Sequence, residues 1–386
     1  MNPSRTFVFI LGALIGIVGG LLLASNDVIT VNGEELSLSD EAIEVIGGSY
    51  FREPDLRKLG DASVNGIVDE LRKRYDDRFS HYFDPETLED FNAQTSGQFT
   101  GVGLAVVEVK QGLRVAAVYP DTPAKQAGIK PGDVISAVDG EPLADLSAEA
   151  AAAQIKGEPG TKVTLEVSTG KEMPRPVEVE RAAVRIPAVR GEIKRVGADK
   201  RAIAYVQLAT FSEGAHAELR EEIERLYRRG AEGLVLDLRG NGGGLLNEGV
   251  LTSSVFVEDG LIVATEGRTQ RRREYDAVGD AIEPRPAAVL VNGDTASASE
   301  ILTAALADYD LAEIVGTTTF GKGTVQEVIE LENGGALDLT VGEYLTSEDV
   351  SLAGSGIKPD VKIEDEPKTA PDEALDEALA IVNGEL

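Results

Sequence analysis

The spacing of hydrophobic residues divides this chain into regions with different predicted secondary structure. Across residues 40–92, apolar residues recur every three or four positions, which is the period of an amphipathic helix. Within this region, the pair Asp84-Pro85 predicts the start of a helix. Residues 98–185 instead contain short β-branched runs broken by glycine, with alanine-rich helices predicted at 122–127 and 148–155. The second region is therefore expected to be a compact, partly β module.

Beyond residue 186 the pattern becomes an alternation of strands and helices. Buried strands are predicted at residues 203–208, 234–238 and 287–291, and an amphipathic helix at 214–228. Alternating strands and helices are typical of α/β layers. A polar segment then leads into a short C-terminal helix at about residues 373–381.

The N-terminal residues 7–24 form an uninterrupted run without charge, about the length that a helix needs to cross a bilayer. Arg5 precedes this run and favours a cytoplasmic amino terminus. The run is therefore expected to be a single-pass membrane anchor. Leu22 and Ala24 leave open the alternative of a cleaved signal peptide. Both interpretations place the rest of the chain outside the cytoplasm.

The amino-acid composition limits the kinds of reaction and binding site that the chain can support. The chain has 386 residues, enough for two or three domains, and its 42% hydrophobic and 27% charged residues are typical of globular proteins. A net charge of −30 disfavours nucleic-acid binding. Cysteine is absent and there are two histidines, so neither a metal nor a cofactor is expected. Hydroxyls, carboxylates, lysine and backbone amides must carry any reaction.

Ser297 is the candidate nucleophile. It lies at a predicted helix start, where the next backbone amide, that of Ala298, lacks an intrahelical acceptor and the helix dipole favours negative charge. The alternative is that Ser297 and Glu300 only form a helix-capping box. Ser299 is the neighbouring candidate.

Lys322 is the candidate base, because neither histidine lies near this serine in the sequence and a serine hydroxyl needs a neighbour that removes its proton. The segment 316–322 is similar to a phosphate-binding loop, but Gly323 replaces the required Ser or Thr and a strand is predicted next. If Lys322 and Gln326 both lie in that strand, they face the same side. A surface lysine beside a surface glutamine is the alternative. Catalysis would require Lys322 to be buried, with no carboxylate beside it.

Glycine-rich segments supply two further candidate sites. Residues 240–244 follow a predicted buried strand, and their amides could form either an oxyanion hole or only a flexible turn. Residues 100–104 and 121–135 together resemble a PDZ domain. That resemblance implies that a loop receives the terminal carboxylate of a peptide, which adds as a strand beside it. The loop residues would be Gly101, Val102, Gly103 and Leu104.

Taken together, the motifs resemble the carboxyl-terminal processing proteases, family S41 of the serine peptidases. They are residues 79–85, the PDZ module, residues 236–244, the Ser297 and Lys322 segments, and residues 356–360. The resemblance implies that Ser297 is the nucleophile, Lys322 the general base and Gln326 the residue that orients the lysine. Gly243 and Ala298 would supply the oxyanion amides. Residues 345–350 depart from the family, which more often has a turn with proline and glycine there.

The resemblance also implies an overall organisation. It is a mixed α/β multidomain chain: a layered α/β peptidase core of the crotonase/ClpP-like kind, an inserted PDZ domain and an N-terminal transmembrane helix. The expected boundaries are 1–25 for the anchor or signal, 26–97 for a helical region, 98–185 for the PDZ domain, 186–365 for the peptidase core and 366–386 for a tail helix.

The predicted function is an exported endopeptidase that captures unfolded or tagged proteins by their C-terminal ends. The membrane is the expected partner of the N-terminal helix, and a homo-oligomer or an adaptor protein is a further candidate partner. The alternative is a catalytically silent, membrane-tethered PDZ scaffold that binds C-termini without cutting them. Burial of Lys322 beside Ser297 would distinguish the two, because a scaffold has no need of an uncharged lysine there.

Overall fold

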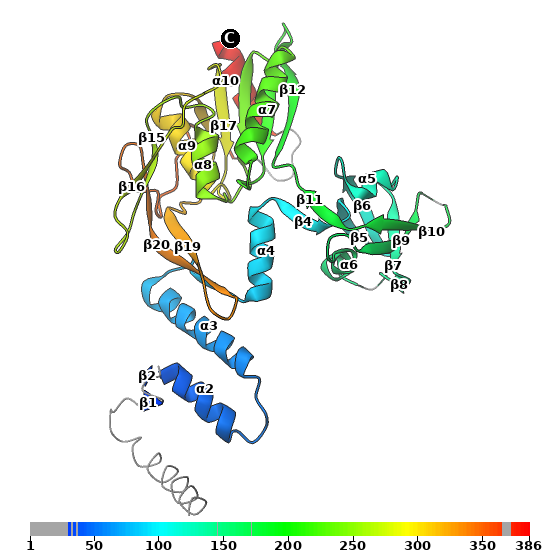
Figure 1. Cartoon of the computed structure of the whole chain (residues 1–386). Coiled ribbons are helices and arrows are strands. Elements are labelled where there is room, and N and C mark those ends of the chain that lie inside the picture. The colour runs from blue at the N-terminus through cyan, green and yellow to red at the C-terminus, as the bar shows by residue number, and fades with distance from the viewer. Residues whose placement is uncertain (1–29, 32–33, 36–37, 145, 171, 365–371) are drawn as a thin grey trace, which may run out of the picture. The chain divides into compact units, whose positions relative to one another are not determined.

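The computed structural model describes residues 30–31, 34–35, 38–144, 146–170, 172–364 and 372–386. These residues divide into two compact units, one ending at Tyr82 and the other comprising Phe83–Leu386 (Figure 1). The expected membrane segment, residues 7–24, lies outside the described residues. Within the described part of the chain, no helix has the length and apolar character needed to cross a bilayer.

The N-terminal unit consists mainly of helices, as predicted. Helix α2 comprises Leu38–Ser49 and α3 comprises Leu56–Tyr75; the short strands β1 (Thr30–Val31) and β2 (Glu34–Glu35) pair with each other. Asp55 caps α3 by accepting hydrogen bonds from the backbone N–H groups of Arg57 and Lys58, at 3.1 and 3.2 Å. Strand β3 (His81–Phe83) follows α3 and includes the boundary between the two units.

Helix α4 (Pro85–Thr95) leads into the second unit and begins where the sequence predicts. Asp84 is its N-cap, and its carboxylate accepts a hydrogen bond from Thr87 N at 2.9 Å. Strand β4 (Gln98–Gly101) then pairs antiparallel with β11 (Ala182–Arg185). The chain therefore enters and leaves the PDZ region through one two-stranded ribbon.

The region between β4 and β11 has the predicted partly β architecture. Its sheet has the order β10-β9-β7-β6-β5, with β8 paired to β7, so that β5 is an edge strand. Helices α5 (Pro123–Gln126) and α6 (Ala148–Ile155) match the two predicted alanine-rich helices. The strands are β5 (Leu104–Val109), β6 (Gly112–Val118), β7 (Val134–Val138), β8 (Glu141–Pro142), β9 (Lys162–Ser168) and β10 (Arg175–Glu180).

The core of the remaining residues is a six-stranded sheet of order β12-β13-β14-β17-β18-β21. Only the β12–β13 pair is antiparallel. The strands are β12 (Val189–Val196), β13 (Arg201–Leu208), β14 (Gly233–Asp237), β17 (Ala287–Val291), β18 (Glu313–Gly316) and β21 (Val361–Lys362). Helices cover both faces, which is why all five residues of β14 are buried.

Alternate residues of β14 belong to different hydrophobic clusters on the two faces of the sheet. Leu234 and Leu236 of β14 belong to the cluster formed with α7 (Ala215–Arg228) and α9 (Ala298–Asp308), whereas Val235 packs in the cluster formed with α10 (Glu373–Glu385). The amphipathic helix and the C-terminal helix predicted from the sequence are thus on opposite faces of one sheet.

A second sheet, which the sequence pattern did not predict, has the order β16-β15-β20-β19. Its strands are β15 (Leu261–Glu266), β16 (Arg273–Asp276), β19 (Thr324–Glu330) and β20 (Ala336–Thr346). Buried residues of this sheet pack against α8 (Leu246–Ser253) and α9. Helix α9 therefore lies between two sheets, and every residue from Ala298 to Leu306 is buried.

Candidate active site

Ser297 occupies a strained turn at the start of α9. Its backbone dihedrals are φ 58° and ψ −119°, close to those of the first corner of a type II′ turn. The turn is closed by a hydrogen bond from Ser299 N to Ala296 O at 3.1 Å. A residue with a side chain rarely adopts a positive φ, and such strain costs about 1–3 kcal/mol. An ordinary N-cap has extended backbone instead, so capping alone does not account for this conformation.

The side chain of Glu300 connects the turn at Ser297, here called the serine turn, to the loop of residues 317–323 that contains Lys322, here called the lysine loop. Its carboxylate is fully buried, and a single oxygen, Oε2, accepts hydrogen bonds from the backbone N–H groups of Ser297 and Lys322, each at 2.9 Å. The other oxygen accepts from Gly321 N at 2.7 Å and from the Thr319 hydroxyl at 2.5 Å. Glu300 therefore completes one half of the capping box and also holds the two candidate catalytic residues next to each other.

Lys322 is partly buried in the loop before β19. Burial lowers the pKa of its side chain below the ordinary value for lysine, whereas the charges of Asp338 and Glu300 act in the opposite direction. The expected desolvation is therefore present. The expectation that no carboxylate lies beside the lysine was wrong, because two acidic residues influence it. Asp338 on β20 comes close through the hairpin that β20 forms with β19, whose register the sequence pattern did not predict.

Gln326 lies in β19, but Lys322 does not. Because the strand begins at Thr324 and its pairing with β20 shifts between Val325 and Gln326, strand alternation does not fix the direction of Lys322 relative to Gln326. The Gln326 amide nitrogen donates to the hydroxyls of Thr324 and Thr340, at 2.9 and 3.3 Å. The predicted orienting role of Gln326 remains a prediction.

The glycine-rich loop lies against the serine turn. It connects β14 to α8, and Gly243 has φ 98°. A Cβ at Gly243 would lie 2.8 Å from the Ser297 Cβ and 2.9 Å from the backbone nitrogen of Ala298, so only glycine fits at this position. The structure thus brings together Gly243, Ser297 and Ala298 as the sequence predicts.

The N–H of Gly243 already has an acceptor in this structure. It donates to Oδ1 of Asn241 at 2.9 Å, while the Asn241 side-chain nitrogen donates to Leu208 O at 2.8 Å. Gly243 can donate to an oxyanion only if it shares or exchanges this hydrogen bond. Ala298, the first residue of α9, has one of the N–H groups that a helix start leaves without an intrahelical acceptor.

Two other hydroxyl groups lie near Ser297, and their environments differ from that of the Ser297 hydroxyl. Ser299, the alternative nucleophile, is completely buried and donates to Asn241 O at 2.9 Å, so it holds the glycine loop in place. Tyr344 of β20 was not predicted from the sequence, although its side chain is hydrogen-bonded to that of Ser297. Burial raises the pKa of Tyr344 to about 12, and the hydrogen bond with Ser297 acts against this increase. Tyr344 is therefore a neutral hydroxyl at pH 7.

The predicted carboxylate-binding loop connects β4 to the edge strand β5. Gly101, Val102 and Gly103 are buried, and Leu104 begins β5. Gly103 has φ 89°, and a Cβ there would lie 2.3 Å from the Thr122 side chain. Val102 O accepts from Ala124 N at 2.8 Å, which ties the loop to α5. The loop and the edge strand are placed as the PDZ resemblance implies.

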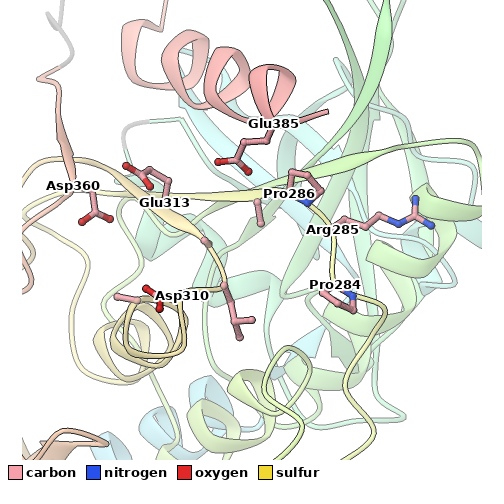
Figure 2. A pocket seen from close by; sticks show the side chains of 11 residues that line it. Pro284, Arg285, Pro286, Asp310, Glu313, Asp360 and Glu385 are labelled. Carbon is pink, nitrogen blue, oxygen red and sulfur yellow. The ribbon is translucent and has the colours of Figure 1, made fainter.

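A separate hollow of about 520 Å³ lies at the other end of the parallel strands (Figure 2). It adjoins the amino ends of β17 and β18, whereas the serine turn and the glycine loop follow carboxyl ends. Four acidic residues line it: Asp310, Glu313, Asp360 and Glu385. Arg285 points away from them in Figure 2, and it donates to Ala231 O. This hollow is not part of the candidate active site.

Known proteins share both the sequence and the fold. Residues 202–363 match the family model of peptidase family S41, and residues 114–168 match a PDZ domain model. The carboxy-terminal-processing protease of Bartonella bacilliformis is 36% identical over 348 residues, which are 87% of this chain and 78% of that protein. The carboxy-terminal processing protease CtpA of Bacillus subtilis is 35% identical over 326 residues, covering 84% and 68% of the two chains.

Among solved structures, the photosystem II D1 C-terminal processing protease is similar to this chain, with a TM-score of 0.50 and 31% sequence identity. The match covers 88% of this chain and 96% of that one. Sequence and structure therefore agree from the PDZ region through the peptidase core. The chain belongs to peptidase family S41 and is a serine peptidase related to the carboxy-terminal processing proteases.

Proposed function

We propose that this protein is an exported endopeptidase in which Ser297 and Lys322 form the catalytic dyad and the PDZ domain selects substrates by their C-terminal ends. The observation that carries the proposal is the shared acceptor Glu300 Oε2, which holds the backbone nitrogens of Ser297 and Lys322 at 2.9 Å each. The burial that lowers the pKa of Lys322 supports its role as a neutral base. It also counts against the catalytically silent scaffold.

The reaction is acyl transfer. Neutral Lys322 takes the proton of the Ser297 hydroxyl as Oγ attacks a peptide carbonyl, and the Ala298 N–H with an amide of the glycine loop stabilises the oxyanion. The lysine then gives its proton to the departing amine, which leaves an ester on Ser297. Water attacks this ester and its proton passes to Lys322. The lysine then gives that proton to the departing Ser297 Oγ, which releases the product acid and restores the serine hydroxyl and the neutral lysine.

The dyad is tested with the full-length chain, purified in a mild detergent, and an unfolded protein that ends in apolar residues. Ser297→Ala and Lys322→Ala are each expected to abolish cleavage, because they remove the nucleophile and the base. Ser168→Ala and Lys110→Ala, which change a serine and an exposed lysine of the PDZ domain, serve as matched controls. Cleavage that persists in either dyad variant would refute the assignment.

C-terminal recognition has its own test. The edge strand β5 and the loop at residues 101–104 support the binding of an extended peptide whose carboxylate meets backbone amides. Amidation of the substrate's C-terminus is expected to weaken cleavage by the full-length protein. A protein lacking residues 99–182 that still cleaves a short peptide, with the same dependence on the free C-terminus, would exclude the PDZ domain as the recognition element.

Export rests on the sequence of residues 7–24 and on Arg5. The experiment is to fuse a reporter that is active only outside the cytoplasm after Leu386. Activity in cells is expected, with loss of activity when three residues of the apolar run are replaced by aspartate.

A further inference from the structure

A second cavity, of about 630 Å³, lies beside α4 within the unit Phe83–Leu386. Three aromatic side chains and Ile186 line it: Phe83, Phe91 and Phe99. The rings of Phe83 and Phe91 stack with centroids 4.9 Å apart, and Ile186 is 40% exposed. This volume is within the range of about 300–1,000 Å³ that is usual for ligand sites. Polar and charged residues, among them Asp90, Gln94 and Lys156, complete the lining around the aromatic rings.

One wall of the cavity is the backbone that holds the glycine loop. Thr210 lines the cavity, and its hydroxyl donates to Gly243 O at 3.4 Å. The neighbouring Phe211 N donates to the same carbonyl at 3.0 Å, and Leu245 N donates to Phe211 O at 2.9 Å. On its other side, Gly243 lies directly against Ser297. Two adjoining backbone segments, the one that follows β13 and the glycine loop, therefore lie between the cavity and Ser297.

The opposite wall is fixed to the same backbone. Glu213 N donates to Thr95 O, at the end of α4, at 3.0 Å, and Ile186 N donates to Gly97 O at 2.9 Å. Gly97 is so close to the Ser212 side chain that a Cβ there would lie 2.8 Å from its hydroxyl oxygen. These contacts attach α4 and β4 to the segment that follows β13. The walls of the cavity are thus held by hydrogen bonds to the same segment that supports the glycine loop.

We propose that this cavity is a substrate subsite, which receives one large apolar side chain of the polypeptide within a few residues of the bond that is cut. The inference rests on the proposed function. Because an extended chain advances about 3.3 Å per residue, a substrate bound at Ser297 spans the width of these two adjoining segments within a few residues. The aromatic part of the lining favours leucine, phenylalanine or a similar side chain, whose burial there would stabilise the bound substrate.

The test compares peptides that differ only by leucine or serine at each of the positions on both sides of the scissile bond. In the full-length parent, the ratio of kcat/KM for leucine over serine is expected to be high at one position. Phe91→Ser, which makes the lining polar, is expected to lower that ratio by roughly tenfold. Phe51→Ser, at an aromatic residue of the N-terminal unit that is 77% exposed, is the matched control and should leave the ratio unchanged.

A second variant keeps the test independent of the folding of Phe91→Ser. Ala93 also lines the cavity, and Ala93→Leu reduces its volume without introducing polarity. This variant is expected to discriminate against phenylalanine more strongly than against valine at the same position. If both variants change all substrates equally, or change none, the subsite is refuted; occupation by a second copy or by another segment of this chain would give that result.

Labelling of Ser297 with a fluorophosphonate separates this failure from failure of the proposed function. A parent protein that takes the label and cleaves peptides, with selectivity that neither variant alters, would overturn the subsite alone. A parent protein that neither takes the label nor cleaves would overturn the catalytic assignment and the subsite together.

Discussion

At the scale of single residues, the backbone of Ser297 links stability to chemistry. Its φ of 58° is strained for serine and for alanine, but not for glycine. We expect Ser297→Gly and Ser297→Ala to be equally inactive, with the glycine variant more stable by about 1 kcal/mol in denaturant unfolding. Ser253, the last residue of helix α8, is the control, and there alanine should be the more stable replacement. Equal stability of the two Ser297 variants would mean that the turn is not strained.

The buried carboxylate of Glu300 permits a second prediction. Glu300→Gln keeps the size of the side chain but replaces one acceptor oxygen with an N–H₂ group, which cannot accept from the backbone amides. We expect kcat/KM to fall by roughly 100-fold, because small displacements of catalytic groups cost that much. Glu327→Gln on the exposed side of β19 is the control. A folded Glu300→Gln protein with nearly full activity would show that the shared acceptor does not position the dyad.

Asp338 is expected to influence the pH dependence of the reaction. Its charge raises the pKa of Lys322, against the larger lowering by burial. In the proposed mechanism activity requires neutral lysine, so kcat/KM is expected to rise with pH through this pKa. Asp338→Asn removes the raising influence and should move the rising limb of the profile to lower pH. Glu332→Gln, in the exposed turn before β20, is the control. A shift to higher pH would contradict the assignment of Lys322 as the base.

At this scale, the sequence could predict which residues form the candidate site, from their types and their order in the chain. Ser297, Lys322 and the glycine loop could be selected because their motifs are local, and the structure brings their segments together. The strained dihedrals of Ser297 could not be predicted, because surrounding tertiary contacts hold them. The proximity of Tyr344 was equally inaccessible, because its end of β20 pairs with β15, far away in the chain. Asp338 comes close through the β19–β20 hairpin, whose register the sequence pattern did not predict.

At the scale of elements, α10 stabilises the sheet that carries the active-site loops. Its residues Ala374, Ala378, Leu379 and Val382 are buried, and Asp372 at its N-cap forms ion pairs with Arg239 at 2.8 and 2.9 Å. We expect Ala378→Asp to lower the free energy of unfolding by about 2–5 kcal/mol, because it buries a charge. Ala380→Asp on the exposed face is the matched control and should change little. Equal effects would mean that α10 does not pack as described.

Helix α7 and the central strands β13, β14 and β17 were predicted because their signals are local, whereas β18, β21 and α8 were not predicted. The amphipathic period of α7 and the continuous apolar runs of β14 and β17 can be read within short windows. The second sheet was missed, because β15 and β20 are partly polar and pair across a separation of many residues. Whether such partly polar segments form strands depends on the helices that pack against one of their faces.

At the scale of the whole molecule, the net charge of −30 predicts substrate preference. Acidic substrates are repelled and basic ones attracted, and salt screens both effects. Raising the ionic strength from about 0.01 to 0.15 M is expected to increase kcat/KM for an acidic peptide and decrease it for a basic peptide of equal length. Neutral peptides serve as the control. Identical salt responses for the three peptides would show that the charge lies away from the path of the substrate.

The two-stranded ribbon of β4 and β11 has a consequence for how proteins with this fold can evolve. Because both connections to the PDZ domain run side by side, its first and last residues adjoin, and the domain is an insert with a single point of attachment. A foreign domain with adjacent termini, grafted between Gly101 and Ala182, would leave every residue of the serine turn, the lysine loop and the glycine loop in place. The proposed recognition of chain ends and the cleavage of bonds could therefore evolve separately, as two exchangeable parts of one gene.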